Sequence, residues 1–339
     1  MIDFIDFKED TRYAFAVGKI RVLESRLIDK AGIERMVEAS DAQGVLNILN
    51  ETEYATSISN LKSIYDFETI LNDELKKVLK LISDLSNEPK LTALFLLKYD
   101  FQNLKSLTKS KYFKKDLDNL LIEGALIDIE KLKEIFGEER FGDLPYNISE
   151  IVKKALEEVE KSKEPQIIDI IYDKELYSLL YSKSEEAGNP FIKQFFQISI
   201  DLANLKTFIR VKELNLEREF LEKVLLDFGF IEKKTLLEMY EERVDTLLQR
   251  LAYTPYRKVL EEGLKDWKKE RSFRQFERCC NNFILEFLSK TRYVVFGVEP
   301  LIGYLIAKEN EITTIRVIMI GKLNNLSKET ILERVESSQ

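Results

Sequence analysis

The most informative absence in this sequence of 339 residues is histidine, of which there is none. Histidine is the commonest general base and metal ligand in proteins, so its absence excludes Ser-His and Cys-His nucleophiles. The only two cysteines, Cys279 and Cys280, are adjacent. They cannot close a long loop as a disulfide, and they cannot form a tetrahedral metal site without other ligands. We expect two reduced core residues in a cytosolic protein.

Glycine and proline are also scarce, at 12 and 6 residues. Few turns can then need special backbone angles, which favours long helices joined by short loops. The sequence has no glycine-rich phosphate loop, because Gly18-Lys19 and Gly321-Lys322 lack the preceding glycine and the following Ser or Thr. A dinucleotide fingerprint and a nucleophile elbow are missing too. No cofactor is expected, and nothing in the sequence indicates an enzyme.

Long apolar runs and a positive net charge are lacking as well. The longest apolar run, residues 294–307, is interrupted by Glu299 and Pro300, and it is too short for a transmembrane segment. The net charge is −8, whereas a general nucleic-acid binder usually carries the opposite sign. We therefore expect neither a membrane span nor a nucleic-acid partner.

What the sequence does contain is a pattern repeated three times. Pro89, Pro190 and Pro300 are each followed eleven residues later by an acid, which opens the sequences DFQNLK, DLANLK and EITTIR. We call these three stretches the repeat blocks. Self-similarity at a nearly fixed period is typical of a chain built from copies of one structural unit.

A second element recurs between the repeat blocks, as an apolar triplet with the spacing i, i+6, i+9. Its four copies are Leu27, Ile33 and Met36; Leu126, Leu132 and Ile135; Phe230, Leu236 and Met239; and Leu326, Leu332 and Val335. We interpret the two patterns together as three units, with the fourth triplet closing the last one. The predicted units are residues 1–115, 116–220 and 221–339.

Helical periodicity indicates an all-α fold. In each repeat block apolar residues fall on one face at helical spacing, and proline is favoured in the first turn of a helix. We therefore predict core helices, in equivalent places of the three units, over residues 89–107, 190–208 and 300–318. Apolar residues at three- and four-residue steps also predict helical structure over residues 67–85, 148–159, 167–180, 220–250 and 273–288.

The polar residues of the repeat blocks are the candidate functional positions. Residues five apart on a helix point about 140° from each other, so the acid and the base of one block should not pair within their own helix. Either they bond neighbouring elements and fix the packing, or they line a surface that contacts a partner. We predict that the acid and the base of each block are paired and are more buried than typical surface charges; these residues are Asp100, Lys105, Asp201, Lys206, Glu311 and Arg316. The candidates are Asp100, Asn103, Lys105, Asp201, Asn204, Lys206, Glu299, Lys308, Glu309, Glu311, Thr314 and Arg316.

The third repeat block resembles a known family. Residues 297–304 (GVEPLIGY), continued by residues 307–312 and by Ile315-Arg316, are similar to the C-terminal signature of the C subunit of bacterial and archaeal V-type (A-type) ATPases. The eukaryotic counterpart is the d subunit. Residues 13–27, with Arg21, Leu23 and Leu27, resemble the opening helix of that family. The threefold repeat and the chain length agree with it as well.

This resemblance implies an all-α, funnel-shaped protein with three similar helical domains around a pseudo-threefold axis and a central cavity. It implies a non-catalytic central-stalk subunit of a rotary ATPase, which couples the rotor shaft to the membrane rotor ring and transmits torque for ATP-linked ion transport. The implied partners are the D- and F-type shaft subunits and the membrane ring. The implied location is the cytoplasmic face of the membrane, where the chain would be a peripheral part of the complex.

Two other functions fit the residues alone. A helical-repeat adaptor in another cytosolic complex would form an extended solenoid with open ends. An enzyme would need carboxylate or lysine chemistry in a cleft between units, with strongly perturbed pKa values.

Overall fold

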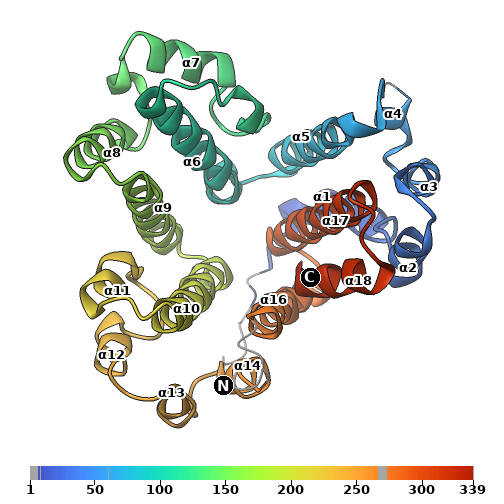
Figure 1. Ribbon diagram of the computed structural model, residues 1–339. Helices are drawn as coiled ribbons and strands as arrows, with labels where there is room; N and C mark the ends of the chain where they lie inside the picture. Colours follow the sequence, from blue (N-terminus) through green and yellow to red (C-terminus); the bar gives the residue numbers. More distant parts are fainter. Residues whose placement is uncertain (1–6, 8, 60, 266–272, 339) are drawn as a thin grey trace. The chain divides into compact units, whose positions relative to one another are not determined.

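The computed structural model describes residues 7, 9–59, 61–265 and 273–338, and over these residues it contains helices and no β-strand (Figure 1). The predicted all-α fold class is therefore confirmed. None of the helices in the described part of the chain is both long and apolar enough to cross a bilayer.

The chain divides into two compact units. Unit 1 joins the two ends of the sequence, residues Met1–Glu88 and Leu251–Gln339, and unit 2 is the middle, Pro89–Arg250. The helices of unit 1 are α1 (Ala14–Glu24), α2 (Lys30–Glu38), α3 (Ala42–Leu49), α4 (Ala55–Ile58), α5 (Phe67–Leu85), α14 (Arg257–Gly263), α16 (Arg274–Ser289), α17 (Glu299–Leu323) and α18 (Lys328–Ser338). Those of unit 2 are α6 (Pro89–Phe113), α7 (Ile129–Gly137), α8 (Ile148–Ser162), α9 (Gln166–Ala187), α10 (Pro190–Glu213), α11 (Arg218–Val224), α12 (Lys233–Glu238) and α13 (Val244–Arg250). Short 3-10 turns are η1 (Thr11–Tyr13), η2 (Ile64–Asp66), η3 (Asp118–Leu120), η4 (Phe141–Asp143) and η5 (Lys290–Tyr293).

The three repeat blocks form the three long helices α6, α10 and α17, as predicted. All three helices also end alike, fourteen residues after the block acid, at a residue with left-handed backbone: Lys114, Asn215 and Asn325 have φ of 54°, 50° and 53°. The amide of the following residue then bonds the carbonyl five positions earlier, which satisfies the open end of the helix. The repeat thus sets both the start and the stop of each helix.

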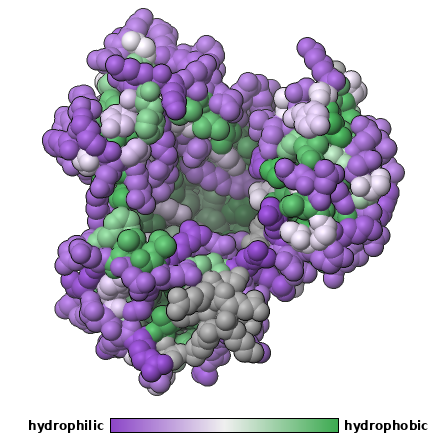
Figure 2. Space-filling model, viewed as in Figure 1, coloured by the Kyte–Doolittle hydropathy of each residue, from purple (hydrophilic) through white to green (hydrophobic). Residues whose placement is uncertain are grey.

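Each unit packs around its long helices. In unit 1, α17 packs against α1, α5 and α18, and in unit 2, α9 packs against α6, α8 and α10. The side chains of Leu301, Leu305, Leu104 and Leu205 are fully buried in these contacts. Full burial of such a side chain contributes about 1.5–3 kcal/mol. Hydrophilic residues cover most of the outer surface seen in Figure 2.

One predicted helical window is wrong as a continuous element. Residues 220–250 form the three short helices α11, α12 and α13 rather than one helix. The gap between α11 and α12 runs through residues 225–232, whose backbone is bonded by buried side chains of α10, as described next. Tertiary hydrogen bonds here override the local helical pattern.

Candidate functional site: the buried polar cluster of each repeat block

The acid of the first repeat block, Asp100, is fully buried in unit 2 and bonds backbone rather than a base. Its carboxylate accepts the amides of Leu126 at 3.2 Å and Ile127 at 2.9 Å. Burial raises the pKa of Asp100 to about 6, against the opposing effect of these two amides. Asn103, also fully buried, binds Ile122 through both its amide oxygen and its amide nitrogen, at 2.7 and 2.9 Å. The two side chains together hold the segment that leads into α7.

The second repeat block repeats this geometry. Asp201 accepts the amides of Phe230 at 3.1 Å and Ile231 at 3.0 Å. Asn204 binds Leu226 through both backbone groups, at 2.8 and 2.9 Å. These bonds fix the extended segment that leads into α12, which explains the break in the predicted helix.

The third repeat block takes its partner from the other end of the chain. Glu311 accepts the amide of Ile28 at 2.6 Å with one oxygen and the hydroxyl of Tyr54 at 2.9 Å with the other. Ile28 leads into α2, just as Ile127 leads into α7 and Ile231 into α12. The first apolar triplet, not the fourth, therefore stands in the equivalent place beside α17. The fourth triplet, predicted to close the last unit, extends into α18.

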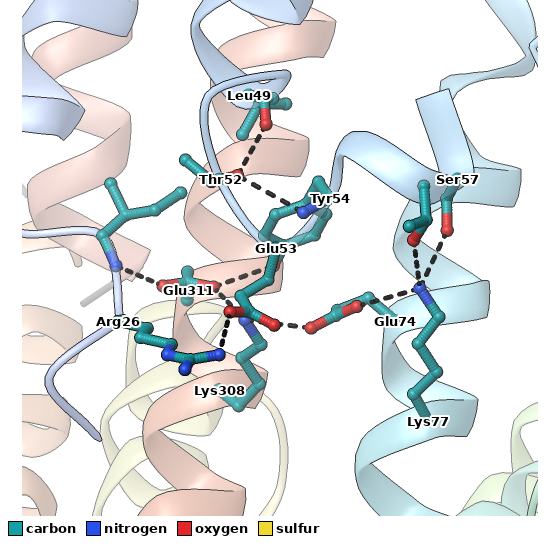
Figure 3. A network of polar contacts seen from close by, with 12 residues as sticks. Arg26, Leu49, Thr52, Glu53, Tyr54, Ser57, Glu74, Lys77, Lys308 and Glu311 are labelled. Carbon is teal, nitrogen blue, oxygen red and sulfur yellow. Dashed lines mark hydrogen bonds and ion pairs between the residues drawn. The ribbon is translucent and has the colours of Figure 1, made fainter. Parts of the chain in front are cut away.

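A buried lysine balances the third acid (Figure 3). Lys308, which is 2% exposed, donates to Glu311 at 2.7 Å and lies 3.1 Å from Glu74 of α5. Burial lowers the pKa of Lys308, but attraction to Glu311 and Glu74 outweighs it, so the net shift is upward and the ammonium stays charged. Burial, reinforced by Glu311, raises the pKa of Tyr54, which keeps its hydroxyl a donor.

Two of the three block bases form an ion pair with a neighbouring helix. Lys105 of α6 forms an ion pair with Asp173 of α9, and Arg316 of α17 forms one with Glu68 of α5 at 2.9 Å. The side chain of Arg316 is 33% exposed and that of Lys105 is 13% exposed. Lys206 is half-buried on α10.

The other candidates lie along α17. Glu299 is buried in the first turn, Thr314 is buried three residues after Glu311, and Glu309 is half-buried. The described residues hold no group of three or more Cys, Asp or Glu side chains placed to bind a metal ion.

Sequence reasoning missed a third repeated polar position, a lysine eleven residues after each block acid. Lys322 donates to the carbonyls of Val37 and Ala39 at the end of α2, both at 2.6 Å. Lys212 donates likewise to the carbonyls of Tyr240 and Glu242, just after α12.

In the first block, Lys111 pairs with Glu139, after the end of α7, at 2.6 Å. Extending the comparison of the three blocks by six residues would have found this signal. Each long helix thus contacts a short helix, α2, α7 or α12, at both of its ends. The block acid bonds the segment before the short helix, and the lysine contacts residues at or after its C-terminal end.

The cluster geometry supports a structural role for these side chains. The acids and amides are buried and directed at backbone, so they position chain segments and offer no open reactive group. The arrangement can resist relative displacement of a long helix and its partner segment, because each buried bond that is broken leaves a polar group unsatisfied.

Comparison with known proteins finds similar sequences over nearly the whole chain. The chain is 28% identical to the C subunit of the V-type sodium ATPase of Enterococcus hirae over 316 residues, which cover 93% of this chain and 95% of that protein. It is 27% identical to the C subunit of the A-type ATP synthase of Methanocaldococcus jannaschii, with 94% and 85% covered. The corresponding protein of Methanosarcina acetivorans is 24% identical, with 97% and 94% covered.

The match to a protein family covers much more of the chain than residues 13–27 and 297–316, which carry the resemblance in the sequence. The match to the ATP synthase (C/AC39) subunit family runs from residue 16 to residue 334. It includes α6, α10 and α17 together with the segments that their acids hold. This chain therefore belongs to the ATP synthase (C/AC39) subunit family.

Proposed function

We propose that this chain is the non-catalytic central-stalk subunit of a rotary V/A-type ATPase. It couples the rotor shaft to the membrane rotor ring and so transmits torque for ATP-linked ion transport. The family match over residues 16–334 carries this proposal. The partners are the D- and F-type shaft subunits on one side and the ring on the other, at the cytoplasmic face of the membrane.

The way in which the third repeat block is completed supports a closed arrangement of units. Glu311, near the end of the chain, holds Ile28, near its beginning. An open-ended solenoid would leave its last block without such a partner or cover it with a dedicated cap. We propose that residues 1–115, 116–220 and 221–339 are three similar helical units around a pseudo-threefold axis, with a funnel-like central cavity.

The polar clusters suit a part that carries load. A coupling protein must not yield between its two attachment points, and packed helices with satisfied buried bonds have little room to deform. The ion pairs Lys105–Asp173 and Arg316–Glu68 add side-chain bridges between adjacent helices of each unit.

The test is reconstitution of the complex with and without this chain, with ATP hydrolysis and ion pumping recorded together. Without it, the soluble motor should still hydrolyse ATP, while ion pumping should be lost. The chain alone should hydrolyse no ATP. Undiminished pumping without the chain would overturn the coupling role and favour the adaptor function.

A matched pair of variants sharpens the test. K105A/R316A removes these two ion pairs between helices and should lower the number of ions moved per ATP in the assembled complex. K328A/K234A removes two lysines that are exposed and should leave this ratio unchanged. Equal ions-per-ATP ratios for the two double variants would show that these ion pairs do not contribute to torque transmission.

A further inference from the structure

The outer face of α1 carries an exposed apolar stripe in unit 1. Phe15, Lys19 and Val22 follow one another at i, i+4 and i+7, so they share one face of the helix. Phe15 is 77% exposed and Val22 is 52% exposed. The opposite face of α1 is buried and packs against α17. The stripe therefore points away from the core of the unit.

Residues 291–296 run beside α1 in the opposite chain direction. The guanidinium of Arg21 donates to the carbonyls of Thr291 and Val294, both at 2.9 Å. Before the other end of α1, the amide of Asp10 donates to the carbonyl of Phe296 at 3.2 Å. These contacts hold the segment along the length of the helix.

The segment adds two more exposed apolar side chains. Tyr293 is 86% exposed and Val295 is 60% exposed, whereas Val294 between them is buried. Tyr293 is the last residue of the 3-10 turn η5, and Val295 follows it by two residues. With Phe15 and Val22 they form what we call the α1 strip.

The α1 strip is basic although the chain carries a net charge of −8. Lys19 on α1 and Arg292 next to Tyr293 are exposed, and neither forms an ion pair with any residue in the described part of the chain. Aromatic and apolar side chains interleaved with unpaired cations are typical of surfaces that contact the interface of an anionic bilayer.

The apolar side chains of the α1 strip lie outside the two cavities of about 510 and 500 Å³ in the described part of unit 1. Arg292 is the one residue of this surface that borders a cavity, the second of the two. Exposed apolar side chains on the surface favour insertion into a lipid layer over binding in a preformed pocket of a protein.

We propose that the α1 strip docks on an anionic phospholipid surface. Phe15, Val22, Tyr293 and Val295 enter the headgroup region, while Lys19 and Arg292 pair with lipid phosphates. This contact is independent of the stalk role, since it requires a membrane surface and not a ring or a shaft.

Flotation of the full chain with lipid vesicles tests the proposal. The chain should float with vesicles of phosphatidylcholine and phosphatidylglycerol in equal parts and not with phosphatidylcholine alone, and added salt should weaken the binding. K19E/R292E should lower the affinity at least about 25-fold, since each cation near an anionic surface contributes about fivefold. F15S/Y293S should abolish flotation at an unchanged melting temperature.

The matched control is Tyr253→Ser, which removes a 95% exposed aromatic residue of unit 1 outside the strip and should leave flotation unchanged. Failure of the full chain to float with either vesicle, or flotation that survives F15S/Y293S, would overturn the proposal. Strip variants that float normally but no longer join the complex would assign the strip to a protein partner instead. A chain that floats but does not couple ATP turnover to pumping would overturn the stalk role alone.

Discussion

Replacement of Lys308 by methionine tests whether the buried cluster of unit 1 holds the two ends of the chain together. The lysine lies between two carboxylates, at 2.7 Å from Glu311 and 3.1 Å from Glu74, and all three side chains are less than a tenth exposed. Without the ammonium, two acids remain buried in one cluster. Removal of one partner of a buried ion pair costs about 3–5 kcal/mol.

The control is Lys77→Met. Lys77 also approaches Glu74, at 3.5 Å, but its side chain is 49% exposed. Solvent screens such a pair, and its loss should cost less than about 1 kcal/mol. In a unit of this size each kcal/mol lowers the melting temperature by about 2–4 °C. K308M should therefore melt roughly 10 °C below the parent chain, and K77M within about 4 °C of it.

A double variant distinguishes the effect of buried charge on stability from the effect of lost side-chain packing. In K308M/E311Q one of the two buried carboxylates becomes a neutral amide, whose oxygen can still accept from Ile28 or Tyr54. This variant should be more stable than K308M alone by about 1–2 kcal/mol. Calorimetry or urea unfolding gives both numbers. Equal melting temperatures for K308M and K77M, or a double variant less stable than K308M, would refute the reasoning.

Three further substitutions address the first two repeat blocks and the segments that they hold, and a fourth, G18A, is a control. Because burial raises the pKa of Asp100 to about 6, the folded state binds its proton more tightly than the unfolded state, and stability falls as pH rises from about 4 to 6. Urea unfolding of D100N across this range should lack that component, so the variant gains about 3 kcal/mol relative to the parent between pH 4 and 7. N204A should cost about 2–4 kcal/mol in the same assay, since it leaves a buried amide and a buried carbonyl unsatisfied. G229A places a methyl group 2.1 Å from the carboxylate of Asp201 and should lower the melting temperature, whereas G18A, with open space around it, should raise it slightly.

The positions of the long helices could be predicted because their signals are local. A proline at the first turn and apolar residues on one face specify α6, α10 and α17 without reference to the rest of the chain. The predicted window 67–85 likewise has the same bounds as α5. A helix can be predicted from the sequence alone when its apolar periodicity and its terminal residues indicate the same bounds.

The partners of the polar residues could not be predicted in the same way. The acid of each repeat block bonds the backbone of another segment, and a backbone amide carries no sequence signature. The ion pair between Arg316 and Glu68 joins residues 248 positions apart, and the sequence offers 60 acids as possible partners. The positions of the charged residues in the repeat could therefore be predicted from the sequence, but their partners could be identified only from the folded structure.

The third repeat block differs from the other two for a physical reason. Asp100 holds amides 26 and 27 residues ahead in the chain, whereas Glu311 holds Ile28 across 283 residues. Closing a loop about ten times longer costs roughly 2 kcal/mol more in chain entropy.

The additional contacts of Glu311 with Tyr54 and Lys308 are of the size needed to offset that cost, since a hydrogen bond to a charged group contributes about 1.5–3 kcal/mol. The exchange of Asp for Glu also lengthens the side chain by one methylene, which lets one carboxylate reach a backbone amide, a phenol and an ammonium. Glu311, the acid that departs from the repeat, is thus the one that joins the two ends of the chain. Loss of its contacts should therefore separate these two parts of unit 1 more directly than any other change in the repeat blocks.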